Sequence, residues 1–215
     1  TFPVVSGSDF VPISPNGQLV ALVDGSAVRV RELDTDREIF AVNGLNRGVN
    51  SFTRDVVFSP DSKILACPDG KHQNDITLRD TASGNEIGTL KGFESRPNIL
   101  EFSANGKRLA GMDYAGKIRI LDVTTRTEVP FTTNVVFVSA QDMAFSPDGN
   151  RIALYSFGSP IQIVDIRSGE VTTLKGNDGG SGCMRFSPDG TRLASAALYG
   201  RQVKIWDVTP QTGSK

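Results

Sequence analysis

Few side chains in this sequence could carry out hydrolysis. Two carboxylates that face one substrate can cleave a glycosidic bond, one acting as the acid and the other as the base or nucleophile. Asp55, Glu101 and Asp142 are the nearest candidates for such a pair, and Asp9 precedes them in the chain. Three of these acids within about 10 Å of one another at one end of a channel would favour glycosidase chemistry.

The sequence lacks the residues that other kinds of catalytic or cofactor site require. The one histidine, His72, and the absence of a G-x-S-x-G elbow leave no Ser-His-Asp triad. Cys67 and Cys183 form no C-x-x-C pair, and no run of His, Cys and acids suggests a metal. The GGSG run at 179–182 lacks the lysine and the helix of a phosphate-binding loop. The sequence therefore predicts no enzyme activity, no metal and no cofactor.

Composition narrows the classes of partner. The chain has 215 residues and a net charge of −1, without a basic stripe, which disfavours nucleic acid. Its apolar runs are too short for a transmembrane helix, and it has no signal peptide or N-x-S/T sequon. The lack of sequons and two cysteines expected to be free thiols predict an intracellular, cytoplasmic location, and no membrane partner is expected. They leave the oligomeric state open.

One phrase recurs along the chain. "FSPDG" occurs at 145–149 and at 186–190, and the looser copies ISPNG, FSPDS and FSANG precede it. The serines of the five copies stand at 14, 59, 103, 146 and 187, so the steps are 45, 44, 43 and 41 residues. A period of this length suits one four-stranded β-sheet per repeat.

Each copy of the phrase has the same surroundings. Apolar residues two apart precede it, as in Met143/Phe145, and predict a first strand. The phrase itself predicts a tight turn, and second, third and short fourth strands follow. An alanine seven residues after each serine indicates close approach of neighbouring sheets. These alanines are Ala21, Ala66, Ala110, Ala153 and Ala194. The acids that end the third strands are expected to hydrogen-bond to turn amides, and they are Glu32, Asp80, Asp122, Asp165 and Asp207.

The pattern "FSPDG…LA…IKIWD" at 186–207 resembles the WD-repeat β-propeller family, and the resemblance covers essentially the whole chain. It implies an all-β propeller of four-stranded antiparallel blades. Trp206 is the single tryptophan at the family's position, and His72 lies away from the family's Gly-His step. The resemblance therefore implies that the family's buried Asp-His-Ser-Trp network cannot be assembled here. The residues in the place of tryptophan in the other repeats are Arg31, Arg79, Leu121 and Val164.

We expect residues 1–215 to form a single five-bladed domain. The last repeat ends at Asp207 without a fourth strand, and "FPVVSG" near the start reads like the "TLKG" fourth strand of another repeat. Pairing of Phe2–Val5 beside Val203–Asp207 would close the ring and remove exposed sheet edges. On this prediction residues 1–8 complete the last blade and 209–215 form a tail. Two alternatives are a frayed leading segment and five blades of a larger ring.

The two rims of such a ring differ. The Ser-Pro turns and the turns after the third strands share one rim, here called the turn rim, and are uniform in length. The fourth-to-first and second-to-third connections share the other, the loop rim, whose longest members surround the second blade at 44–54 and 67–75. Variable loops on a rigid scaffold often carry function, and aromatics with arginines favour protein binding. The candidate partner-binding residues are Arg47, Phe52, Arg54, Lys71, His72, Phe93, Arg96, Tyr114, Tyr155, Tyr199 and Arg201.

Two function classes follow from these patterns. The resemblance implies a non-catalytic scaffold that presents the loop rim to a protein or peptide partner, as part of a larger protein or assembly. The alternative is a five-bladed propeller that binds a small molecule or glycan, lectin-like or glycosidase-like. At the level of single residues, Phe93, Phe131 and Phe157 could instead fill gaps between blades, and the basic side chains could be merely solvated.

Overall fold

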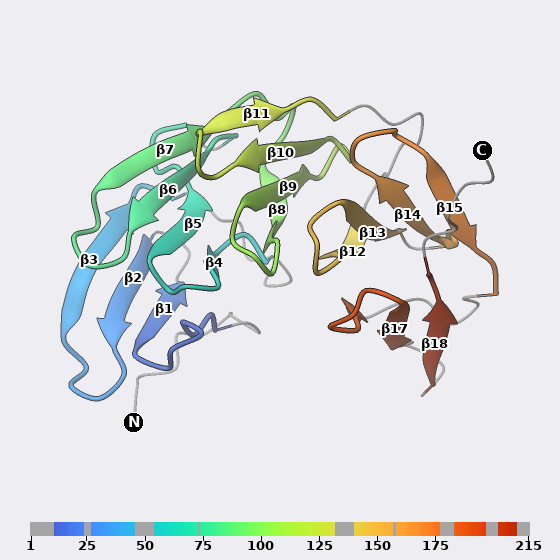
Figure 1. Ribbon diagram of the computed structural model, residues 1–215. Coiled ribbons are helices and arrows are strands. Elements are labelled where there is room, and N and C mark those ends of the chain that lie inside the picture. The colour runs from blue at the N-terminus through green and yellow to red at the C-terminus, as the bar shows by residue number, and fades with distance from the viewer. Residues whose placement is uncertain are drawn as a thin grey trace.

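The computed structural model describes residues 11–23, 27–45, 54–72, 74–131, 140–156, 158–176, 183–196 and 202–209. Within these ranges every regular element is a β-strand, and neighbouring strands of each sheet are antiparallel. The strands form five sheets, called blades 1 to 5, that follow one another around an arc (Figure 1). The predicted all-β class and the five repeated sheets are confirmed. No helix in the described ranges could cross a membrane.

Three of the blades have four strands and two have three. Blade 1 contains β1 (Leu19–Val23), β2 (Ala27–Glu32) and β3 (Glu38–Asn43), and blade 2 contains β4 (Val57–Phe58), β5 (Ile64–Pro68), β6 (Ile76–Asp80) and β7 (Glu86–Leu90). Blade 3 contains β8 (Pro97–Phe102), β9 (Arg108–Asp113), β10 (Ile118–Asp122) and β11 (Thr127–Val129). Blade 4 contains β12 (Ala140–Phe145), β13 (Arg151–Ser156), β14 (Ile161–Asp165) and β15 (Val171–Leu174), and blade 5 contains β16 (Cys183–Phe186), β17 (Arg192–Ala196) and β18 (Val203–Asp207).

The first strands of successive blades lie next to one another on the inner side of the arc. β4 contacts β8, β8 contacts β12, and β12 contacts β16. In blade 1, Ile13 takes the place of a first strand through an isolated antiparallel bridge to Val20. The inner side of the arc is therefore built from the segments that precede each Ser-Pro turn.

The recurring phrase is a hydrogen-bonded turn. In blade 4 the Ser146 hydroxyl donates to Asp148 at 2.5 Å and accepts from the Arg151 amide at 2.9 Å. The closing glycine of the turn has a positive φ, 70° at Gly149, which glycine adopts without a Cβ penalty. In blade 2, Ser62 takes this position with φ 64°. The repeated phrase thus ties the first strand to the second by the same bonds in each blade.

Four of the five third-strand acids accept turn amides, as predicted, whereas Glu32 of blade 1 accepts instead from the Thr35 hydroxyl and the Arg37 guanidinium. Asp165 Oδ1 accepts the amides of Arg167 and Ser168 at 2.9 and 2.8 Å, and Asp122 and Asp207 accept amides in the same way. Each of these turns also bonds back to the Ser-Pro turn of its own blade, as Ile166 N–H does to the Asn150 carbonyl at 2.8 Å. The two kinds of turn therefore share one rim.

The apolar core lies between blades. Four clusters of buried side chains join blades 1 and 2, 2 and 3, 3 and 4, and 4 and 5. Four of the five repeated alanines are wholly buried in these interfaces, while Ala194 of blade 5 is half-buried. The prediction of close approach at the alanine is confirmed for blades 1 to 4.

One bond of the family's polar network, between tryptophan and serine, is present in blade 5. The Trp206 indole N–H donates to the hydroxyl of Ser195 at 3.0 Å, and Ser195 is 2% exposed. In blades 1 and 2, arginines stand in place of the tryptophan and bond to other groups. Arg31 donates to the carboxylate of Asp36, and Arg79 donates to the carbonyl of Gly84. The segment Phe2–Val5, predicted to close the ring, lies outside the described residues, as do all of residues 1–8. Most of the predicted tail at 209–215 lies outside them too.

Candidate interaction surface

Asp113 holds the loop rim of blade 3 together. It is 1% exposed, and its Oδ2 accepts the backbone N–H groups of Glu94 and Ser95 at 2.9 and 3.0 Å. Its Oδ1 accepts the Lys117 amide at 2.8 Å, and the Lys117 ammonium pairs with Glu94 at 2.6 Å. The β7–β8 and β9–β10 connections therefore meet on one rim, as the sequence predicted.

A second meeting of loops occurs where blade 1 joins blade 2. Gly44, at φ 85°, approaches Gly70 so closely that a Cβ added to it would lie 2.9 Å from the Gly70 carbonyl oxygen. The exposed side chains of Lys71 and His72 follow directly, and the Lys71 amide donates to Asp69 at 2.7 Å. The described part of the long blade 2 loop is thus anchored at its base and presents basic side chains to solvent.

The predicted partner-binding residues divide into distinct groups. Lys71, His72 and Tyr114 are exposed on the loop rim, Tyr114 to 47%. Phe93 and Tyr155 are 6% and 1% exposed and pack in the clusters between blades, so as placed they offer no surface to a partner. Arg47, Phe52, Tyr199 and Arg201 lie outside the described residues, as do Asp9, Phe157 and the GGSG run. Phe131 packs against the cluster between blades 3 and 4, which agrees with the gap-filling alternative.

Arg54 and Arg96 turn toward buried acids at the inner strands. The Arg54 guanidinium donates to Asp142, and Arg96 Nη2 lies 3.0 Å from Asp55 Oδ2. Both aspartates have side chains that are 0% exposed. Asp142 also accepts the amides of Met143 and Met184, the latter from blade 5. These two arginines are therefore interblade supports, a role that loop spacing did not reveal.

Glu101 on β8 is the third acid of this group. The charged groups that act on it are the guanidiniums of Arg185 and Arg54 and the carboxylate of Asp142. Burial raises the pKa of Glu101 to about 7, and the two arginines offset only part of this rise. Its carboxyl therefore changes charge near neutral pH.

The condition for glycosidase chemistry was that three of the acids lie within about 10 Å of one another. Among the described acids, the carboxylates of Glu101 and Asp142 interact with each other electrostatically. Two of the three acids are engaged by arginine hydrogen bonds, and Glu101 accepts none within the described ranges. Retaining and inverting mechanisms both require two carboxyl groups that are available to the substrate. The arginine bonds of Asp55 and Asp142 support a structural role for these two acids.

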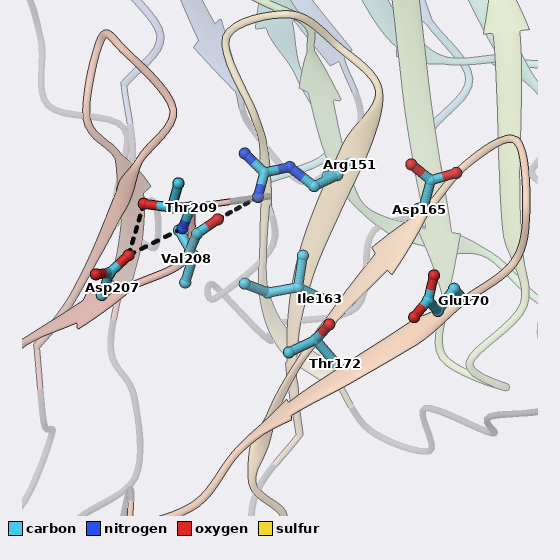
Figure 2. A pocket seen from close by; sticks show the side chains of 8 residues that line it. All are labelled: Arg151, Ile163, Asp165, Glu170, Thr172, Asp207, Val208 and Thr209. Atoms are coloured by element: carbon cyan, nitrogen blue, oxygen red, sulfur yellow. Dashed lines mark hydrogen bonds between the residues drawn. The ribbon is translucent and has the colours of Figure 1, made fainter. Parts of the chain in front are cut away.

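A cavity of about 440 Å³ lies on the turn-rim side between blades 4 and 5 (Figure 2). Its walls include the apolar Ile163 and Val208 and the carboxylates of Glu170, Asp165 and Asp207. Asp207 of β18 is one of its lining residues. In the described sheet β18 pairs only with β17. No pattern in the sequence indicated this cavity, since the turns of the turn rim are uniform in length.

Comparison with known proteins agrees with the repeat pattern. The family model described as "WD domain, G-beta repeat" matches residues 168–207. WD repeat-containing protein 1 of Mus musculus is 47% identical over 203 residues, and its Rattus norvegicus counterpart is 30% identical over 203 residues. WD repeat-containing protein SL1-17 of Schistosoma mansoni is 29% identical over 134 residues.

These relatives are longer than the chain. The aligned residues are 91% of this chain and 32% of the mouse and rat proteins, and 62% of this chain and 44% of the schistosome protein. The chain thus spans about a third to less than half of the length of these three relatives.

Proposed function

Because the chain belongs to the WD-repeat family, we propose that it is a non-catalytic scaffold whose loop rim binds a protein or peptide partner. The observation that carries the proposal is the exposed set Lys71, His72 and Tyr114 on loops that are pinned by Asp113 and by the Gly44–Gly70 approach. Exposed aromatic and basic side chains on rigid supports lose little entropy on binding and are typical of protein interfaces.

Arg47, Phe52, Tyr199 and Arg201 extend the same proposal to segments outside the described residues. Phe93 and Tyr155 are left out because they are buried, and Arg54 and Arg96 act as supports beneath the rim. We further propose an intracellular location, with no membrane or nucleic-acid partner, on the basis of the low cysteine count, the lack of N-x-S/T sequons and a net charge of −1.

The test is a pull-down with the whole chain carrying Lys71→Glu and Tyr114→Ala. The matched control carries Lys107→Glu and Thr124→Ala, which are exposed positions on the turn rim. We expect proteins captured by the unmodified chain to be lost with the loop-rim variant and kept with the control. Recovery that is the same for all three chains would count against the loop rim as the binding surface.

A further inference from the structure

Three asparagines in this chain are followed directly by glycine, and they are Asn16, Asn43 and Asn105. In an Asn-Gly pair the backbone nitrogen of the glycine can attack the side-chain amide carbon of the asparagine, because glycine has no Cβ to hinder the approach. The attack needs a backbone nitrogen that is free to lose its proton and a side chain that is free to turn toward it. The contacts of each pair therefore decide where the reaction occurs in the folded protein.

Asn16 lies in the Ser-Pro turn of blade 1, where both reacting groups are hydrogen-bonded. The Gly17 N–H donates to the Ser14 carbonyl at 2.8 Å. The Oδ1 of Asn16 accepts the Ser14 hydroxyl at 2.7 Å and the Gln18 amide at 3.1 Å. Attack by the Gly17 nitrogen would therefore have to break its own bond and release a side chain that is held at two points.

Asn105 holds the equivalent place in the turn of blade 3 and has the same bonds. The Gly106 N–H donates to the Ser103 carbonyl at 2.8 Å. The Oδ1 of Asn105 accepts the Ser103 hydroxyl at 2.8 Å and the Lys107 amide at 3.0 Å. The recurring turn thus protects both of the Asn-Gly pairs that it contains.

Asn43 is placed differently, at the last residue of β3, and Gly44 follows the strand with φ 85°. The pairing of β3 with β2 ends at Asn43, opposite Ala27. Within the described ranges the Asn43 side chain makes no hydrogen bond, and the Gly44 N–H donates none. Asn16, Asn43 and Asn105 are all exposed, so hydrogen bonding and not access to solvent separates the three pairs.

We propose that Asn43 and Gly44 form a site of spontaneous modification, at which the asparagine is converted to aspartate and isoaspartate in the folded protein. The Gly44 nitrogen forms a bond to the Asn43 Cγ, and the bond between Cγ and Nδ2 breaks. The Nδ2 group leaves as ammonia with the proton that the Gly44 nitrogen gives up. Water then opens the cyclic imide, at one carbonyl to give aspartate and at the other to give isoaspartate. In isoaspartate the main chain runs through the former side chain.

Isoaspartate at this position would disturb the contact between blades 1 and 2. A Cβ added to Gly44 would lie 2.9 Å from the Gly70 carbonyl oxygen, and one added to Gly70 would collide with the Asn43 carbonyl oxygen. Isoaspartate adds one carbon to the main chain at this backbone-to-backbone contact, and close packing does not accept an extra methylene without a shift. The base of the connection between β5 and β6 should therefore loosen.

The first experiment incubates the whole chain at mildly alkaline pH, folded and in guanidinium chloride, and follows the three pairs by peptide mass spectrometry. The mass gain on loss of ammonia separates deamidation from isomerisation at Asp-Gly pairs such as Asp69 and Gly70. For each pair the rate in the folded protein is divided by the rate in the denatured protein. We expect this ratio to be about tenfold or more higher at Asn43 than at Asn16 or Asn105, whose hydrogen bonds must break first. Equal ratios at the three pairs, or a lower ratio at Asn43, would overturn the proposal.

The second experiment tests the effect on the contact with Gly70 by hydrogen exchange of the amides at 69–72. The unmodified chain after incubation should exchange faster there than before, whereas Asn43→Gln, whose longer side chain closes an imide far more slowly, should not change on the same incubation. Freshly prepared Asn43→Asp is the matched control, since it has the charge of the product without the longer main chain, and should exchange like the fresh unmodified chain. Faster exchange in fresh Asn43→Asp would assign the effect to charge. That result, or equal exchange in incubated unmodified and Asn43→Gln chains, would overturn the predicted loosening.

Discussion

Arg54 and Asp142 stand 88 residues apart in the sequence, and the guanidinium of the first donates to the buried carboxylate of the second. The same carboxylate accepts the Met184 amide of blade 5. The Asp142 side chain on β12 of blade 4 therefore bonds both to Arg54, in the segment that precedes blade 2, and to the first strand of blade 5. Inner-strand charge pairing thus adds a support to this fold beyond the apolar clusters between neighbouring blades.

Arg54→Met should destabilise the protein by about 3 kcal/mol, because it leaves the Asp142 carboxylate buried without its counter-ion. Arg167→Met is the control, since Arg167 is an exposed arginine on the turn rim, away from the inner acids, and should cost less than about 0.5 kcal/mol. Urea denaturation of both variants measures the difference. Equal, small losses would show that Arg54 does not support the buried acid.

Glu101→Gln should alter how stability depends on pH. The folded protein holds the pKa of Glu101 at about 7, above its ordinary value of 4.5, so the folded state keeps a proton that the unfolded chain has released. The unmodified protein should therefore lose stability as the pH rises from about 4.5 to about 7, and then level off. The stability of Glu101→Gln should not show this fall between about pH 4.5 and pH 7, so the variant should be more stable than the unmodified protein above pH 7.

Thermal unfolding between pH 4 and pH 8 measures this effect. Glu170→Gln, an exposed glutamate near the turn rim, serves as the control and should keep the pH profile of the unmodified protein. Parallel profiles for the unmodified protein and Glu101→Gln would contradict the assignment.

Phe93→Ala should act on stability rather than on partner binding. The ring is 6% exposed and fills the space above Gly111, where an added Cβ would lie 2.7 Å from the Phe93 Cζ. Truncation of a buried phenylalanine costs about 3–5 kcal/mol. Tyr114→Ala, on the exposed rim of the same blade, should cost less than about 0.5 kcal/mol, and denaturation curves of the two variants test the contrast.

The repeat could be predicted because its signals are local. The Ser-Pro turn bonds within six residues, the strands alternate with period two, and the alanine recurs at one place, so spacing alone predicted five sheets and their interfaces. The same logic would have predicted the burial of Tyr155, which lies two residues after Ala153 on β13 and hence on the same face, toward blade 5. An aromatic side chain at this place in a strand is therefore no sign of exposure when its position in the alternation puts it on the face toward the next blade.

Interblade pairing could not be predicted from one sequence. Nothing in the spacing of Arg54 and Arg96 indicates that they point inward to Asp142 and Asp55, because the partners come together only when separate blades assemble. The place of Phe93 had a faint signal in Gly111, a glycine within a strand, which often marks the close approach of another group. No signal in the sequence indicated the cavity between blades 4 and 5, since the cavity depends on which strands border it.

The two cysteines should react at very different rates. Cys67 is 0% exposed, and burial raises the pKa of its thiol to about 11, whereas Cys183 is exposed. Because the thiolate is the reactive form, iodoacetamide at pH 8 should label Cys183 in the folded protein and reach Cys67 only after denaturation. Mass spectrometry of the labelled peptides counts both sites, and rapid labelling of Cys67 under native conditions would contradict its burial in blade 2.

Trp206→Phe should show that the indole hydrogen bond, and not the ring alone, matters in blade 5. The variant keeps an aromatic ring but leaves the Ser195 hydroxyl, 2% exposed, without its donor at 3.0 Å. A buried polar group without its partner costs about 1–3 kcal/mol, whereas removal of both partners is nearly neutral. Trp206→Phe with Ser195→Ala should therefore recover much of the loss caused by Trp206→Phe alone. Urea denaturation of the two single variants and the double variant gives the coupling energy directly. Strictly additive losses would mean that the bond contributes nothing beyond packing, and that blade 5 resembles the tryptophan-free blades in how it is held.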